Sequence, residues 1–511
     1  MGSLAALEEG VILDYILNAA EAAEIDRISI HETGIPSVVL MEKAAMAVAH
    51  HIKEICSTSY KNILPGNIKV LAVCGIGNNG GDGIACARML KEAGFNASIF
   101  LAGNKDKATE ETKRQAAIAV NLDVPFITKP EDNEYNIIID ALFGTGLSRD
   151  IGGIYAEWVD WINRQPSEVI AVDIPSGINA DNGQIYGCAV KASHTVTFGS
   201  NKRGTVLFPG AAYSGRVVVA DIGFPGKAVH KAAPGAYTYK KEDLPRLMPE
   251  RRMRSNKGSF GKVLIIAGSA GMSGACILAA KAAARTGCGI VKIATAPQNT
   301  DIIKTCLPEA ITGTYADGIT ESLEWADVIA IGPGLGTDGT AKKLVEEVLK
   351  VQDKPVVMDA DALNLLPKLV PEGTGIDRYN LSDNFVITPH IKEMSRLSGA
   401  EVNEIQEDII NYASCHKCGC TVVLKDARTV VSDGSRIYIN TTGNNALSTA
   451  GSGDVLCGII TGMLAQGMEL MEAASLAVLV HGITADVYAE KKNKYSMLAS
   501  DIIEELQFVL P

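Results

Sequence analysis

Short apolar runs alternate with stretches of helical spacing along the first half of the chain. The runs 70–73, 137–139 and 169–172 consist of valine, isoleucine, leucine and alanine, as expected of strands that are buried on both faces. Elsewhere, apolar residues recur every three or four positions, most clearly over 12–28 and 38–55. This alternation predicts an α/β fold with parallel strands and a helix over each of the last two stretches.

The second half of the chain repeats the alternation. Strands are expected at 262–267, 328–331, 356–358, 385–387 and 421–424, with a hairpin that pairs 429–431 and 437–439. Apolar helices are expected at 275–286, 455–464 and 473–488. Between the halves, residues 227–254 lose periodicity and gather prolines, so we place a linker there, between domains at 1–226 and 255–511.

The composition is typical of a globular enzyme. The net charge of −12 over 511 residues argues against nucleic acid, whose binding depends on clustered lysine and arginine. The eleven cysteines are mostly scattered and odd in number, which indicates free thiols in a reducing compartment. No basic stretch opens the chain, and no apolar run approaches the roughly 20 residues that span a bilayer. We therefore expect a cytoplasmic protein without a membrane partner.

The stretch VLAVCGIGNNGGDG, residues 70–83, predicts a strand, a glycine loop and a helix. Such a turn directs free backbone N–H groups and the positive end of a helix dipole at an anion. Its glycines match a dinucleotide fingerprint, although ordinary tight turns also attract glycines. The next strand, 97–101, lacks the terminal acid that would bind a ribose, which disfavours a dehydrogenase. Asn78, Asn79 and Asp82 instead indicate a polar ligand.

Two further strands of the first half end in polar loops. Asp140 follows one and leads into LFGTGLSRD, and Asp173 follows the other and leads into IPSG. A single acid of this kind is more often a loop cap than a catalyst. Because the carboxyl ends of parallel strands meet at one edge of a sheet, three such loops together predict one shared site.

Gly451-Ser452-Gly453-Asp454 precedes an apolar helix and is the strongest chemical signal in the second half. The glycines let backbone N–H groups face a phosphoryl group, and Asp454 is placed to take a proton from an attacking hydroxyl. Taken alone, the motif would be interpreted as a capping aspartate. It is accompanied, however, by GPGLG at 332–336 and DADALN at 359–364, which favours phosphoryl transfer.

These motifs resemble those of a known family. The first half is similar to NAD(P)H-hydrate epimerases in LNAAEAAEIDR, LMEKA, GNNGGDG, DALFGTGL and DIPSG. The second half resembles the ADP-dependent NAD(P)H-hydrate dehydratases of ribokinase type. The resemblance implies an N-terminal Rossmann-like three-layer sandwich and a C-terminal ribokinase-like three-layer α/β domain. It also implies a bifunctional repair enzyme that epimerises the R and S hydrates of NADH and NADPH and dehydrates the S hydrate at the expense of ADP.

The resemblance assigns residues in the first half. Asp173 is implied as the acid–base group, and a potassium ion would be held by Asn79, Asp140 and Ser176. Hydrate-binding positions are Asn78, Asn79, Gly80, Gly81, Asp82, Gly144, Thr145, Gly146, Leu147, Ser148, Arg149, Asp150 and Asp173.

The resemblance also assigns residues in the second half, with Mg²⁺ as the expected cofactor and ADP as co-substrate. Hydrate-binding positions are Ala275, Gly336, His390 and Asp454, the last also catalytic. Nucleotide-binding positions are Lys425, Asp426, Ala427, Arg428, Thr429 and Gly453. Asp426 departs from the family pattern, which usually has glycine there, and sets an acid near the expected nucleotide. Lys392 stands where glycine is commoner, and AGSGD replaces the usual GTGD.

Other interpretations remain open at this point. The second half could be a vitamin or sugar kinase, although kinases of this fold tend to carry asparagine where His390 stands. The first half could be a non-catalytic binding module. Cys415, His416, Cys418 and Cys420 could bind a metal, but a helix end leading directly into a strand disfavours four ligands around one ion. We expect free thiols there, and a homo-oligomer whose other partners are small molecules only.

Overall fold

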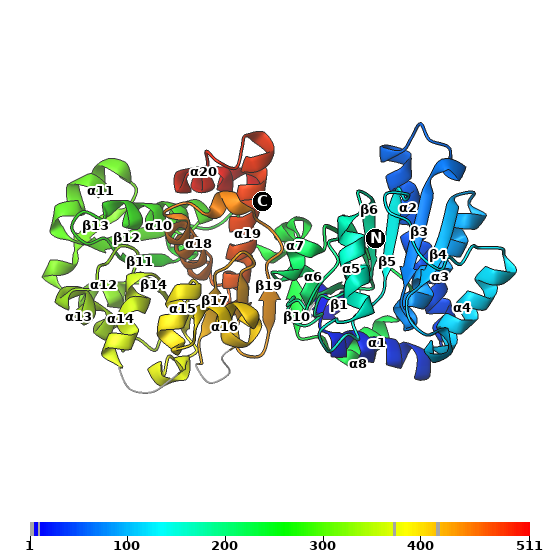
Figure 1. The fold of residues 1–511 in the computed structure, drawn as a ribbon. Helices are drawn as coiled ribbons and strands as arrows, with labels where there is room; N and C mark the ends of the chain where they lie inside the picture. The colour runs from blue at the N-terminus through cyan, green and yellow to red at the C-terminus, as the bar shows by residue number, and fades with distance from the viewer. Residues whose placement is uncertain (1–4, 9–10, 371–374, 415–418) are drawn as a thin grey trace. The chain divides into compact units, whose positions relative to one another are not determined.

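The computed structural model describes residues 5–8, 11–370, 375–414 and 419–511. The chain forms two compact units, Met1–Tyr237 and Thr238–Pro511, and each contains a set of parallel strands (Figure 1). The division falls inside the segment predicted as a linker. The domain limits 1–226 and 255–511 themselves stay a prediction.

A six-stranded parallel sheet with the order β4-β3-β5-β6-β7-β9 forms the first unit. Its strands are β3 (Lys69–Cys74), β4 (Asn96–Leu101), β5 (Ile137–Ala141), β6 (Glu168–Val172), β7 (His194–Phe198) and β9 (Arg216–Ala220). Alternate residues of β3 face opposite sides: Val70 and Ala72 belong to one core cluster, and Leu71 and Val73 to another. The two clusters confirm the predicted three-layer sandwich.

Helices cover both faces of this sheet. On one face lie α2 (Ser37–Ser59), α3 (Asn78–Glu92) and α4 (Glu110–Asn121), and on the other lies α5 (Ile154–Arg164). The remaining helices of the unit are α1 (Ala19–His31), α6 (Arg203–Val206), α7 (Gly210–Tyr213) and α8 (Gly226–Ala232). In the predicted linker, α8 buries Ala228 and Val229 against Ile25 and Ile28 of α1. This helix therefore belongs to the core of the first unit.

The helix predicted over 12–28 is wrong in its first part. Residues Val11–Leu17 form strand β2, which pairs with β1 (Ala5–Glu8) and with β8 (Asn201–Lys202). Helix α1 begins only after Asn18, whose side chain accepts a hydrogen bond from the Glu21 N–H at 2.7 Å in a capping box. A short apolar run is compatible with the periodicity of a helix and with that of a strand. The strands available for pairing therefore decide which of the two forms.

The sheet of the second unit has the order β19-β18-β17-β16-β15-β14-β11-β12-β13. Pairing is parallel from β13 to β17 and antiparallel from β17 to β19, which confirms the predicted hairpin. Its strands are β11 (Lys262–Ile266), β12 (Ile290–Thr295), β13 (Ile311–Thr314), β14 (Val328–Ile331), β15 (Val356–Met358), β16 (Phe385–Ile387), β17 (Thr421–Leu424), β18 (Val430–Ser432) and β19 (Ile437–Ile439). Every residue of β14 to β17 is buried, so helices cover both faces. The unit is a three-layer α/β domain, as predicted.

Helices α10 (Ser273–Thr286), α18 (Ser452–Ala465) and α19 (Leu470–Lys491) lie against these strands or against one another. Helices α10 and α18 pack very closely, because a Cβ at Gly458 would lie 2.1 Å from the Ala279 carbonyl oxygen. The other helices are α9 (Leu244–Leu247), α11 (Thr300–Cys306), α12 (Thr320–Trp325), α13 (Gly339–Val348), α14 (Asp361–Leu369), α15 (Ile391–Ser398), α16 (Val402–Glu407), α17 (Ile409–Ala413) and α20 (Ala499–Val509). The short strand β10 (Ala236–Thr238) lies where the two units meet in the sequence.

One helix corrects the expectation that no apolar segment approaches the length of a membrane span. Helix α19 has 22 residues and is apolar enough to cross a bilayer by length and composition. However, 78% of its apolar window is buried inside the protein. A core helix of a globular domain has the same composition, and burial is the observation that distinguishes it.

Candidate active sites

The carboxyl ends of β3, β5 and β6 open onto one cavity of about 800 Å³ in the first unit. Most of the predicted hydrate-binding residues line it: Asn78, Asn79, Asp82, Gly144, Thr145, Gly146, Leu147, Ser148, Arg149 and Asp173. Loops that are more than 20 residues apart in the sequence thus meet at one edge of the sheet, as the parallel topology requires.

The glycines of the first loop differ from their predicted setting. Helix α3 already begins at Asn78, so Gly80 and Gly81 lie in its first turns and not in a loop. A Cβ at Gly80 would lie 1.9 Å from the carbonyl oxygen of Gly75. These two glycines therefore permit close packing and do not line the cavity. Asp150 is exposed and lies outside the cavity lining.

The residues predicted to hold potassium lie around the turn at residues 143–144. Asp140 is fully buried, and its two carboxylate oxygens accept from the Ser176 hydroxyl at 2.6 Å and the Ser176 N–H at 2.8 Å. The Phe143 N–H donates to the same hydroxyl oxygen at 2.9 Å. The Asn79 side chain lies against Gly144, and its Nδ2 is buried without a hydrogen-bond partner among the described residues.

This donor set fits a hard cation. Burial raises the pKa of Asp140 to about 6, and no described cationic side chain forms an ion pair with it. Carboxylate, hydroxyl and amide oxygens are ligands that a hard cation accepts. A potassium ion would supply the positive charge that the buried carboxylate lacks.

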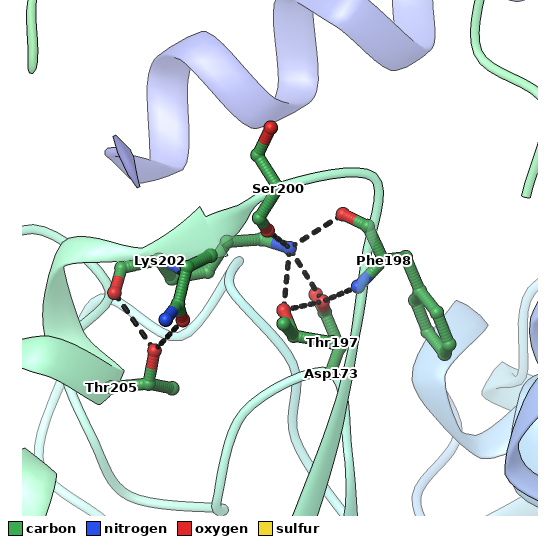
Figure 2. Close-up of polar contacts among 7 residues, drawn as sticks. Asp173, Thr197, Phe198, Ser200, Lys202 and Thr205 are labelled. Atoms are coloured by element: carbon green, nitrogen blue, oxygen red, sulfur yellow. Dashed lines mark hydrogen bonds and ion pairs between the residues drawn. The ribbon is translucent and has the colours of Figure 1, made fainter. Parts of the chain in front are cut away.

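Asp173 has the most elaborate surroundings of the acids in the cavity (Figure 2). Its backbone has a φ of +67°, in the left-handed region that few residues other than glycine adopt. Its Oδ1 accepts hydrogen bonds from Lys202 Nζ at 2.7 Å and Thr197 Oγ1 at 3.0 Å. Lys202 was not predicted from the sequence. The signal that could have revealed it is its place just after the strand that follows Asp173.

Three other acids, Asp26, Asp82 and Glu111, line the cavity with Asp173. Burial and then the nearby charge of Asp173 raise the pKa of Asp82 well above its ordinary value, and the same two causes raise the pKa of Asp26. Asp26 lies in α1 and was not predicted, although it belongs to the motif LNAAEAAEIDR. Neither Asp26 nor Asp82 forms a side-chain hydrogen bond or ion pair within the described part of the chain.

In the second unit, a buried ion pair lies at the carboxyl ends of β15 to β17. Asp359 is 2% exposed, and its Oδ1 accepts from Lys425 Nζ at 2.8 Å and from Thr388 Oγ1 at 2.7 Å. A Cβ at Gly453 would lie 3.4 Å from Lys425 Nζ. The lysine predicted to bind nucleotide therefore reaches from the end of β17 to the first turn of α18.

Asp454 lies in that first turn and is partly buried. Burial, and next the charge of Asp359, raise the pKa of Asp454 to about 6, against the opposing charge of Lys425. Gly451 precedes the helix with a φ of +88°, a conformation in which a side chain would be strained. The arrangement combines a helix N-terminus with a carboxylate that is ionised at neutral pH.

His390 and Gly336 are each held beside this ion pair. His390 caps α15 through its Nδ1, which accepts from the Lys392 and Glu393 N–H groups, and its backbone pairs with Lys425. The Gly336 N–H donates to Asp361 Oδ2 at 2.8 Å. Burial raises the pKa of Glu393 to about 7.

Several functional residues were missed in the sequence. Asp359, Asp361, Thr388 and Glu393 were not assigned roles, although the motif DADALN contains the first two. Ala275 is buried in α10 and would contact a Cβ at Gly334 of the GPGLG loop.

The predicted nucleotide-binding residues that follow Lys425 do not converge on the Asp359–Lys425 ion pair. Asp426 and Ala427 are exposed, and Thr429 is half-buried. Arg428 Nη1 donates to the Thr441 carbonyl at 3.1 Å, and its guanidinium is not drawn into the Asp359 ion pair. Cys415, His416 and Cys418 lie outside the described residues, and Cys420 is buried.

The folds and sites define a class: a two-unit α/β enzyme with a cavity at a sheet edge in one unit and, in the other, a helix N-terminus beside a buried ion pair. Comparison with known proteins makes the class specific. A family model described as NAD(P)H-hydrate dehydratase matches residues 263–508, and one described as YjeF-related protein N-terminus matches 37–204. The bifunctional NAD(P)H-hydrate repair enzyme of Moorella thermoacetica is 36% identical, over 97% of this chain and 96% of that protein.

Two solved structures resemble the second unit. A ribokinase-like superfamily protein of Enterococcus faecalis is 31% identical with a TM-score of 0.50, over 54% of this chain and 95% of that one. The ADP/ATP-dependent NAD(P)H-hydrate dehydratase of Bacillus subtilis, co-crystallised with ATP and Mg²⁺, is 32% identical with a TM-score of 0.47, over 53% and 96%. The chain belongs to the family of bifunctional NAD(P)H-hydrate repair enzymes, which confirms the resemblance found in the sequence. It unites an isomerase that epimerises the hydrates and a lyase that dehydrates them.

Proposed function

We propose that the two activities reside in the two sites described above, with Asp173 and Asp454 as their catalytic residues. The observation that carries this proposal is the placement of each acid. Asp173 lines the cavity of the first unit, and Asp454 lies at the helix N-terminus of the second, beside the Asp359–Lys425 ion pair.

In the first unit, the hydrate occupies the cavity with its altered nicotinamide ring at Asp173. The two epimers differ at one hydroxyl-bearing ring carbon, so their interconversion must break and re-form the bond from that carbon to oxygen. This needs a group that donates a proton to the departing oxygen and takes a proton from the oxygen that returns. The N-terminus of α3, at Asn78 and Asn79, is suited to the substrate's diphosphate. Potassium held by Asn79, Asp140 and Ser176 would add positive charge beside that diphosphate.

In the second unit, ADP phosphorylates the hydroxyl of the S hydrate. Asp454 accepts the hydroxyl proton, and the N-terminus of α18 with Lys425 stabilises the charge on the transferring phosphoryl group. Departure of phosphate from one ring carbon and loss of a proton from the adjacent ring carbon then restore the dihydropyridine ring of NAD(P)H. The carboxylates of Asp361 and Asp454 are of the ligand type that Mg²⁺ takes together with phosphate oxygens, so the residues fit that ion.

The remaining expectations concern the cellular location, the binding partners and the oligomeric state. We propose a cytoplasmic location, supported by the burial of α19 and by the free thiols of described cysteines such as Cys74, Cys86 and Cys457. Partners are then small molecules, and a homo-oligomer stays a prediction that light scattering can check.

One assay tests the two activities together. Mixed hydrates are incubated with the protein and either ADP or ATP, while the absorbance of the reduced nicotinamide is followed. The full chain should convert both epimers, whereas Asp173→Asn should stop once the S hydrate is consumed, and Asp454→Asn should restore no absorbance. Full conversion by both variants would contradict the proposal.

A further inference from the structure

Lys202 is a buried lysine at the wall of the cavity of the first unit. It is 2% exposed and lies in β8, where it pairs with Leu17 of β2. Its Nζ lies within hydrogen-bond distance of Asp173 Oδ1 at 2.7 Å and Thr197 Oγ1 at 2.8 Å (Figure 2). Two backbone carbonyls, of Phe198 and Ser200, complete its surroundings at 3.0 and 3.1 Å.

These four acceptors fix the place of the ammonium group. An ammonium has three N–H donors, and here all of them face protein acceptors. Two of the acceptors are backbone carbonyls, one of Phe198 at the end of β7 and one of Ser200 between β7 and β8, and they cannot move without moving the strands. Lys202 is therefore a stationary positive charge.

The contacts of Asp173 are all made through one of its two carboxylate oxygens. Oδ1 accepts from Lys202 Nζ, from Thr197 Oγ1 and from the Phe198 N–H, the last at 3.3 Å. No described donor bonds to Oδ2, and the side chain lines the cavity. A carboxylate that is anchored through one oxygen presents the other in a fixed direction.

The other acids of the cavity lack such a cationic anchor. Asp26 and Asp82 line the same cavity, but neither is hydrogen-bonded or ion-paired within the described residues. Glu111 also lines it, and its carboxylate accepts from the Ser37 hydroxyl at 2.7 Å. Among these four acids, Asp173 is thus the one that the described part of the structure pairs with a buried cation.

We propose that Lys202 is a positioning residue for epimerisation, which anchors Oδ1 of Asp173 so that Oδ2 points at the substrate hydroxyl. The inference rests on the proposed function, because it takes Asp173 as the acid–base group. Lys202 itself does not touch the substrate in this role. It acts by holding the proton-exchanging oxygen at one place, and small displacements of such groups reduce rates strongly.

The test compares epimerisation and dehydration in the same full chain. Lys202→Met keeps the length of the side chain and removes its charge and donors. We expect kcat for epimerisation to fall about 100-fold while KM changes less than about threefold, since the substrate contacts remain. Dehydration of the purified S hydrate should be unchanged. Arg203→Gln is the matched control, because Arg203 is a neighbouring buried cation that pairs with Glu21 at 3.0 Å and is not bonded to Asp173.

A second variant separates positioning from a merely structural role. Lys202→Ala leaves a space at the cavity wall that small solutes can enter. Propylammonium should restore a measurable part of kcat, whereas 1-propanol, which has a similar shape and no charge, should not. Equal rescue by both solutes, or loss of activity with rescue by neither, would overturn the inference.

The outcome for Asp173 keeps the two proposals distinguishable. If Asp173→Asn epimerises like the unaltered enzyme, the proposed role of Asp173 fails and the inference on Lys202 fails with it. If Asp173→Asn is inactive while Lys202→Met retains the unaltered kcat, only the inference on Lys202 is overturned.

Discussion

We expect dehydration to slow about tenfold for each pH unit below about pH 6. Burial, with a further contribution from the charge of Asp359, raises the pKa of Asp454 to about 6 from its ordinary value of 3.8. A general base acts only while it is ionised, so about nine-tenths of the enzyme is active at pH 7 and about one-tenth at pH 5. At the ordinary pKa, more than about nine-tenths would still be active at pH 5.

Two substitutions test whether the surrounding charges set this midpoint. The charge of Asp361 also raises the pKa of Asp454, and that of Lys425 lowers it. Asp361→Asn retains an oxygen for the Gly336 N–H, and should move the midpoint to lower pH by roughly half a unit. Lys425→Met should move it to higher pH.

The measurement is kcat/KM for dehydration of the S hydrate as a function of pH, since this ratio reports the ionisation of the free enzyme. Circular dichroism at each pH shows that the variants remain folded. A midpoint below about pH 5 in the unaltered enzyme would contradict the reasoning, since the surroundings of Asp454 would then raise its pKa much less than the structure implies. Shifts of the same sign in the two variants would also contradict it.

Four further predictions follow from the same structure. Asp454→Asn should lower the rate of dehydration at least about 100-fold and leave the rate of epimerisation unchanged. The same variant should raise the free energy of unfolding by about 2 kcal/mol above pH 6, because it removes a buried charge, and this gain should disappear as the pH falls toward 3.8. Urea unfolding at several pH values measures it. Asp140→Ala should lower the rate of epimerisation and abolish any dependence of that rate on potassium. An unaltered enzyme that epimerises at the same rate with and without potassium would exclude a functional ion. Gly458→Ala should lower the free energy of unfolding by about 1–3 kcal/mol, because its Cβ would overlap the Ala279 carbonyl oxygen of α10. The fragments 1–237 and 238–511 should each fold, and a mixture of them should convert racemic hydrate completely. The second fragment alone should leave the R hydrate unconverted. If both fragments fold but their mixture also leaves the R hydrate, the first half is better explained as a binding module.

The sequence by itself determined the central strands of both sheets, the parallel sheet type and the chemistry at the strand ends. Runs such as 137–139 and 328–331 contain only residues suited to a strand buried on both faces, so local composition sufficed. Asp140, Asp173 and Asp454 could be found because each marks the end of a strand or the start of a helix: Asp140 lies in the last residues of β5, Asp173 directly follows β6, and Asp454 lies in the first turn of α18. These features depend on neighbours in the sequence, and that is the information a sequence displays directly.

Only the tertiary structure decided which side chains pair. Residues 12–17 form a strand because they find β1 and β8, not because their own pattern excludes a helix. Asp173 and Lys202 are 29 residues apart, and Asp359 and Lys425 are 66 apart. Burial raises the free-energy cost of an unpaired charge and so favours ion pairs such as these. Burial itself results from the packing of distant segments, so it cannot be read from the sequence around either residue. The fold therefore decided the settings of the catalytic acids, whereas the sequence had already decided their identities.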